Sequence, residues 1–114
     1  MAIVLADLLA GGWRNLRFAP FRAGVEMHPI VTGADGEPSV ALLRYAPGAA
    51  VPRHRHEGLE TIVVLDGSQS DDSGTYRAGT VVLNSVGSEH SVWSDDGCVV
   101  LIQWDRPVRF LDEG

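Results

Sequence analysis

Short apolar runs rich in valine, separated by clusters of turn-forming residues, recur along most of this 114-residue chain. Clear examples are TIVVLDG at 61–67, GTVVLNS at 79–85 and CVVLIQW at 98–104. Each run has the length of a β-strand, and the residues between runs are mainly Gly, Pro, Asp and Ser, which favour tight turns. Only the opening of the chain suggests a helical turn. The pattern therefore predicts an all-β domain, a sandwich or small barrel whose strands pack on both faces.

Length, charge and cysteine content restrict the kind of protein further. A chain of 114 residues is long enough for one hydrophobic core, and no linker divides it. The net charge of −6 argues against nucleic acid or an anionic membrane as a partner. The single cysteine, Cys98, has no partner for an internal disulfide, which favours a reducing cytoplasm. The opening MAIVLADLLAGGW lacks a positive N-terminal region and is too short to span a bilayer, so we expect neither signal peptide nor anchor.

The stretch HRHEGLE, residues 54–60, brings metal-ligating side chains together. On a β-strand successive side chains alternate between faces, so His54 and His56 point to one face and Arg55 to the other. A turn after His56 allows Glu60 to begin the next strand and to face back toward the two imidazoles. His90, in GSEHSVWS, lies on a later strand and joins them only through tertiary folding.

Of two other interpretations of this stretch, a surface position remains open and a metalloprotease motif is excluded. His54 and His56 are also compatible with surface positions on an edge strand, with Arg55 and Glu57 forming a solvated charged run. The helical HExxH motif of metalloproteases is absent, because Glu60 stands where that motif has its second histidine.

Two longer motifs surround these residues. GAAVPRHRHEGLETIVVLDG, residues 48–67, resembles the first motif of the cupin family and matches it at every defined position: Gly48, His54, His56, Glu60 and Gly67. GTVVLNSVGSEHSVWS, residues 79–94, resembles the second cupin motif at Gly79, Gly87 and His90. Ser85 and Ser94 stand where that motif has Pro and Asn, which affects the rigidity of the loop rather than the ligands.

Most of the chain is similar to the cupin-like C-terminal domain of ChrR-type anti-sigma factors, from FRAGVEMHPI to GCVVLIQWDRPVRF. The resemblance implies a cupin (RmlC-like) double-stranded β-helix, a jelly-roll barrel, with a short N-terminal helical turn. We expect an N-terminal segment over 1–22, with a short helix and a strand exchanged between copies, and a cupin barrel over 23–114. The expected partners are a small-molecule ligand and a second copy of the chain in a homodimer. The zinc-binding, sigma-binding domain of a full anti-sigma factor has no counterpart in the sequence, so no sigma factor is expected as a partner.

The cupin resemblance also implies one divalent metal ion per chain, bound by His54, His56, Glu60 and His90. Three imidazoles and a carboxylate suit zinc, iron, manganese or nickel, and we favour zinc or iron. We expect a metal-binding, small-molecule-binding or sensory module. The alternative is an Fe(II)-dependent dioxygenase that acts on a small diketone or phenolic ketone, and a purely structural metal is a third interpretation. The sequence identifies no catalytic residue and no organic cofactor.

Several other residues are weaker candidates, each with a structural alternative. His28 either lines a pocket or lies at the surface. Gln103 either orients a metal-ligating side chain through a hydrogen bond or faces outward. Arg44 is a candidate for an anionic substrate group or a surface ion pair, and Cys98 is expected to be a small buried side chain. An aromatic wall over the metal, or else core or dimer packing, is expected for Trp104, Trp93, Phe18 and Tyr45.

Overall fold

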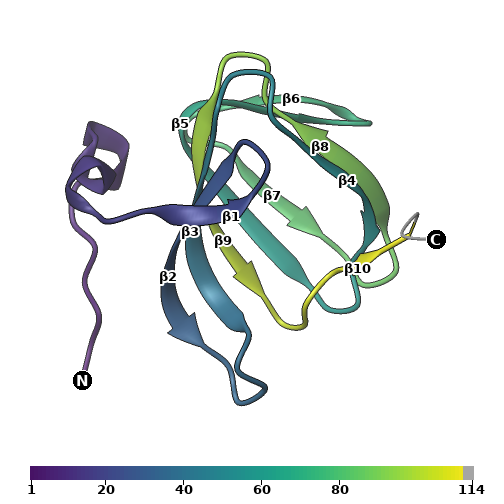
Figure 1. The fold of residues 1–114 in the computed structure, drawn as a ribbon, viewed down its shortest axis with the longest axis horizontal. Coiled ribbons are helices and arrows are strands. Elements are labelled where there is room, and N and C mark those ends of the chain that lie inside the picture. The colour runs from purple at the N-terminus through teal and green to yellow at the C-terminus, as the bar shows by residue number, and fades with distance from the viewer. Residues whose placement is uncertain (112–114) are drawn as a thin grey trace.

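A computed structural model describes residues 1–111 and shows a barrel of antiparallel strands (Figure 1). Two short 3-10 turns, η1 (Leu8–Ala10) and η2 (Gly12–Asn15), precede the strands. The strands are β1 (Ala19–Arg22), β2 (Val25–Thr32), β3 (Pro38–Tyr45), β4 (Ala50–Arg55), β5 (Glu60–Asp71), β6 (Gly74–Arg77), β7 (Val81–Asn84), β8 (Glu89–Trp93), β9 (Cys98–Trp104) and β10 (Arg109–Phe110). Among residues 1–111, no helix is long and apolar enough to cross a membrane.

The strands pair in the order β1-β2-β3-β9-β5-β8-β4-β10, with β6 and β7 both attached to β5. Strands far apart in the sequence are therefore neighbours, as when β3 pairs with β9 and β4 with β8. The sheet curls until its halves face each other across an apolar interior (Figure 1). This is the all-β jelly-roll barrel that the cupin resemblance implied.

Strand β5 belongs to both halves of the barrel. Its first part, beginning at Glu60, pairs with β7 and β9, while its last part pairs with β6 and β8. The pairing with β9 is irregular between Val64 and Asp66, close to where the strand passes from one half to the other. Gly67 follows with a φ of 68°, and a Cβ there would overlap the carbonyl oxygen of Gly97. The last glycine of the first motif is thus required by the bend.

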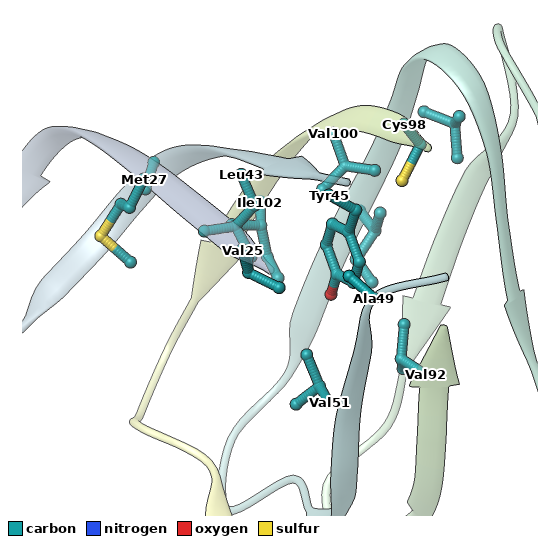
Figure 2. Close-up of a cluster of buried hydrophobic side chains, with 13 residues drawn as sticks. Val25, Met27, Leu43, Tyr45, Ala49, Val51, Val92, Cys98, Val100 and Ile102 are labelled. Carbon is teal, nitrogen blue, oxygen red and sulfur yellow. The ribbon is translucent and has the colours of Figure 1, made fainter. Parts of the chain in front are cut away.

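The inner face of the sheet carries the main hydrophobic core. Figure 2 shows side chains from several strands in it, among them Leu43, Tyr45, Val92 and Ile102. Tyr45 is buried with only 5% of its surface exposed. These side chains fill one end of the barrel interior, and the polar cluster described below lies beside them.

The outer face of the β3–β9–β5 sheet carries a second apolar cluster. Leu42 points outward next to inward-facing Leu43, and it packs with Trp13, Leu65 and Val99. Partly buried side chains from the N-terminal segment and the sheet surround the cluster: Leu8, Leu16, Phe18, Ile30, Val63 and Leu101. The N-terminal segment therefore covers the sheet of its own chain.

Three local expectations can be compared with these elements. The opening helix is two 3-10 turns joined at Gly11, whose φ is 92°. The interval 68–78 between the two motifs extends β5 to Asp71 and forms β6, so it is the tight hairpin for which its eleven residues leave room. The tail adds the expected edge strand as β10, which pairs with β4, and residues 112–114 lie outside the described part of the chain.

Candidate metal centre

Four side chains converge inside the barrel: His54 from β4, His56 just after it, Glu60 at the start of β5 and His90 from β8. Their potential ligand atoms all lie within 4.8 Å of one another. Each of the four residues is buried, whereas Arg55 between the two histidines is exposed. The cluster fits a divalent metal site, and the surface alternative for His54 and His56 is wrong.

Strand pairing sets the positions of these residues. His54 and His90 are directly opposite each other in the β4–β8 ladder, and their rings lie 4.7 Å apart. His56 is fixed by the loop before β8, because its backbone N–H donates to the Ser88 carbonyl and its carbonyl accepts from the Gly87 N–H. A φ of 89° at Gly87 allows that turn. Glu60 is the first residue of β5 and faces the same interior.

The hydrogen bonds of the three imidazoles determine which nitrogen carries a proton. In each ring the Nδ1–H donates to an oxygen, and a carbonyl or carboxylate oxygen can only accept. The acceptors are the Pro52 carbonyl for His54 (2.8 Å), the Ser88 carbonyl for His56 (3.0 Å) and Oδ2 of Asp71 for His90 (3.1 Å). Each neutral ring therefore has an unprotonated Nε2.

These Nε2 atoms point at one another and at a carboxylate. Nε2 of His54 lies 3.1 Å from Nε2 of His90. Nε2 of His56 is buried without a hydrogen-bond partner, although Oε1 of Glu60 is 3.1 Å away. Lone pairs that face one another in a buried space repel unless a cation lies between them. The arrangement itself therefore fits a metal ion with nitrogen and oxygen ligands.

Burial and mutual charge also act on the protonation of the cluster. Burial lowers the pKa of His54. Burial acts in the same direction on His56, but the carboxylate of Glu60 and the Ser88 carbonyl outweigh it, so the pKa of His56 is raised. Burial opposes ionisation of Glu60, yet contact with His56 and the hydrogen bond from Asn84 hold its pKa below the ordinary value. Glu60 is accordingly an anion at neutral pH, as a metal ligand must be.

Two side chains orient the carboxylate of Glu60. Asn84 donates from Nδ2 to Oε1 at 2.9 Å, and Trp104 donates from Nε1 to Oε2 at 2.8 Å. Both residues are directly opposite Glu60, Asn84 on β7 and Trp104 on β9. Asn84 was not predicted from the sequence, and Trp104 was predicted only as part of an aromatic wall or of core or dimer packing. An asparagine inside the apolar run GTVVLNS was the available signal.

Asp71 supports His90 in the same way and was also missed. Its Oδ1 accepts hydrogen bonds from the Tyr76 hydroxyl and the Ser73 N–H, both at 2.8 Å, while its Oδ2 accepts from His90. Burial acts against the charge, but these hydrogen bonds hold the pKa of Asp71 below its ordinary value. A carboxylate behind a ligand histidine fixes the ring and makes it a stronger donor.

The weaker candidates other than the aromatic residues lie outside the cluster. Nδ1 of His28 donates to the Arg17 carbonyl at 2.8 Å, and Gln103 donates to Asp105 at 2.6 Å near the surface. Arg44 forms an ion pair with Glu26 at 2.7 Å. Cys98 is a buried side chain of the inner core, and burial raises the pKa of its thiol to about 11.

A cavity of about 80 Å³ borders His54 and Glu60. Apart from Gln69, its other walls are apolar or aromatic, and Tyr45, Trp104 and Phe110 are among them. Of the four aromatic residues expected to form a wall, only Tyr45 and Trp104 line this cavity, while Phe18 packs on the outer face. The volume has room for two or three water molecules at roughly 30 Å³ each.

Two comparisons with known proteins place the chain in the same family. A sequence model of the ChrR cupin-like domain matches residues 10–106. The anti-sigma-E factor ChrR of Cereibacter sphaeroides is 33% identical over 108 residues, which are 93% of this chain and 50% of that protein. The chain thus spans about half the length of its curated relative.

Solved structures agree with this family in fold. ChrR in the complex of Rhodobacter sphaeroides SigE with the anti-sigma ChrR has a TM-score of 0.74 and 30% identity, covering 88% of this chain and 55% of that one. An acetylacetone dioxygenase from Acinetobacter johnsonii has a TM-score of 0.77 at 16% identity, covering 99% of this chain and 78% of that one. The second likeness, at its low identity, concerns the cupin fold alone.

The expectation about partners is wrong. We expected a homodimer without a connection to a sigma factor, but ChrR, the similar chain, was solved in complex with the sigma factor SigE. The dimer was inferred from the resemblance to cupins together with the apolar segment at 13–21. In the structure, Trp13, Leu16 and Phe18 of that segment pack on the outer sheet face of their own chain, so their apolar character needs no second copy.

Proposed function

Because the chain belongs to the family of ChrR cupin-like domains, we propose that it is a regulatory or sensory module that binds one divalent metal ion. The ion is held by His54, His56, Glu60 and His90. The regulatory part of the proposal is supported by the relative ChrR, which is an anti-sigma factor.

One observation carries the metal site. Three imidazoles present an unprotonated Nε2 to a buried carboxylate, and each Nδ1 is already used in a hydrogen bond. Zinc or iron suits this set of donors, and either ion when bound would supply a Lewis acid or a position for a small ligand. The residues behind the ligands, Asp71, Asn84 and Trp104, hold the donor atoms in place.

The first test is the metal content of untagged protein purified without oxygen from cells grown without added metal. We expect close to one zinc or iron ion per chain, measured by elemental analysis. His54→Ala should lose the ion. His28→Ala is the matched control, because its ring lies outside the cluster, and it should keep the ion. Equal metal content in the two variants would show that the ion binds elsewhere.

A second candidate function is an Fe(II)-dependent dioxygenase acting on a small diketone or phenolic ketone. The observation in its favour is the cavity of about 80 Å³ that borders His54 and Glu60, which leaves space beside these two side chains. Oxygen uptake by the iron-loaded protein, with acetylacetone and related diketones, separates the two functions. Substrate-dependent uptake at an ordinary enzymatic rate would replace the regulatory proposal with the enzymatic one.

A further inference from the structure

A larger cleft, of about 350 Å³, adjoins the cavity beside the metal ligands. The two spaces share the side chains of Phe21, Trp104, Val108 and Phe110 as walls. Pockets that bind small organic molecules in proteins have volumes of about 300–1,000 Å³ and mostly apolar walls. The cleft has the size and the apolar lining of such a pocket.

Arg22, at the end of β1, brings a positive charge to this cleft. Its guanidinium stacks on the ring of Phe110 with 4.2 Å between Cζ and the ring centre. Its Nη1 is buried and has no hydrogen-bond partner. The other charged residue that lines the cleft, Glu37, is exposed, and among residues 1–111 no ion pair joins it to Arg22. A buried guanidinium nitrogen without a hydrogen-bond partner is costly, and an anion bound at the guanidinium would offset that cost.

Arg44 also stacks on a phenylalanine ring, but its guanidinium has a carboxylate partner. Its guanidinium lies 4.3 Å from the centre of the Phe18 ring on the outer face of the sheet. There Nε and Nη2 donate to Glu26 at 3.0 and 2.7 Å. Glu26 therefore pairs with the guanidinium of Arg44, whereas no side chain among residues 1–111 accepts a hydrogen bond from Nη1 of Arg22. The anion-binding role considered for Arg44 from the sequence fits Arg22 better.

We infer that Arg22 binds the carboxylate of a small organic acid whose apolar body occupies the cleft. The planar guanidinium favours a carboxylate, and the walls, which include Met27, Trp104 and Val108, favour an apolar body. Phe110 connects this subsite to the metal ligands, since its ring also makes an edge contact with His54 at 5.8 Å between centres. The inference deepens the proposed function, because it names the class of ligand that a sensory site of this kind would recognise.

The test compares phenylacetate with phenylacetamide, which has the same shape without the charge. The protein has two methionines, and Met27 lines the cleft while Met1 lies outside it, so methyl NMR of labelled methionine reports binding with an internal control. We expect phenylacetate to shift the Met27 signal and to bind roughly tenfold or more tightly than the amide, because a charge-assisted pair is strong. Met1 should not respond.

Variants assign the preference to one arginine. Arg22→Met should bind both compounds equally, Arg22→Lys should keep part of the preference, and Arg44→Met, the matched control, should keep all of it. A preference that survives Arg22→Met in the folded variant, or no shift of Met27 by phenylacetate in the wild type, would overturn the inference. If Arg22→Met does not fold, the Arg22→Lys variant and the wild-type Met27 signal still decide the question.

The same titrations with chelator-treated protein separate this inference from the metal site. An Arg22-dependent preference in a chain that takes up no metal would support the subsite and reject the proposed function. A bound metal without any Arg22-dependent preference would support the proposed metal site and reject the subsite at Arg22. A preference that requires the metal and ignores Arg22 would mean that the metal binds the carboxylate, which also overturns the role of Arg22.

Discussion

The inner and outer faces of the β3–β9–β5 sheet are both buried, but they differ in composition. The cluster on the outer face consists of apolar side chains, with Leu42 and Val99 beneath the N-terminal segment. The inner face borders an apolar core and then a buried cluster of three histidines and a glutamate. Burying polar groups that face one another costs stability unless something binds them. The outer face therefore contributes stability alone, while the inner face gives up stability for a binding site.

The largest expected effect is a gain in the free energy of unfolding on zinc binding, which depends on the inner face and not on the outer face. Zinc at 1,000 times its dissociation constant should stabilise the wild-type fold by about 4 kcal/mol, since only the folded chain presents the site. His56→Ala should remove this increment, because it removes the donor atom that has no other partner. Urea unfolding with and without zinc measures it. A zinc increment that persists in His56→Ala would break the comparison.

On the outer face, Leu42→Ala should lower the free energy of unfolding by about 2–5 kcal/mol, the usual cost of such a cavity. Leu42 is fully buried in the outer cluster and does not line the cavity at the metal ligands. The loss should be equal with and without zinc, and the metal content of the folded protein should stay unchanged. Loss of metal from folded Leu42→Ala would show that the faces are not independent.

A smaller effect on metal affinity is expected from Asp71, which accepts a hydrogen bond from His90. Asp71→Asn should weaken metal binding about 10–100-fold, because the amide does not hold His90 as the carboxylate does. Asp72→Asn is the matched control, since the neighbouring carboxylate pairs with Arg53 at 2.6 Å and accepts from the Ser91 N–H outside the cluster. Competition with a zinc chelator measures both affinities. Equal affinities in the two variants would remove Asp71 from the site.

The smallest effect concerns the orientation of Glu60. Trp104→Phe removes one hydrogen bond to Oε2 but leaves the bond from Asn84 and most of the ring packing. Metal binding should weaken by about 0.5–1.5 kcal/mol, the net value of one hydrogen bond. The same chelator competition detects it. An effect as large as that of Asp71→Asn would mean that Trp104 does more than orient the carboxylate.

The sequence itself determined the fold class and indicated the four residues of the candidate metal site. Strand-length apolar runs with turn residues between them allow little besides a β-sandwich or a small barrel, and period-two alternation places His54 and His56 on one face whatever the topology. The glycine and histidine intervals then resembled one family closely enough to indicate Glu60 and His90. These features are local or nearly so, and local geometry can be derived from neighbouring residues.

Only the tertiary structure decided what surrounds the ligands. Asp71 lies in the hairpin between the two motifs, and it reaches His90 because β5 continues past Gly67 into the other half of the barrel. The apolar N-terminal segment covers its own sheet, and Arg22 rather than Arg44 is left without a carboxylate. Each of these facts depends on pairing between strands distant in the sequence, and a pattern of residue types does not specify which distant side chains meet.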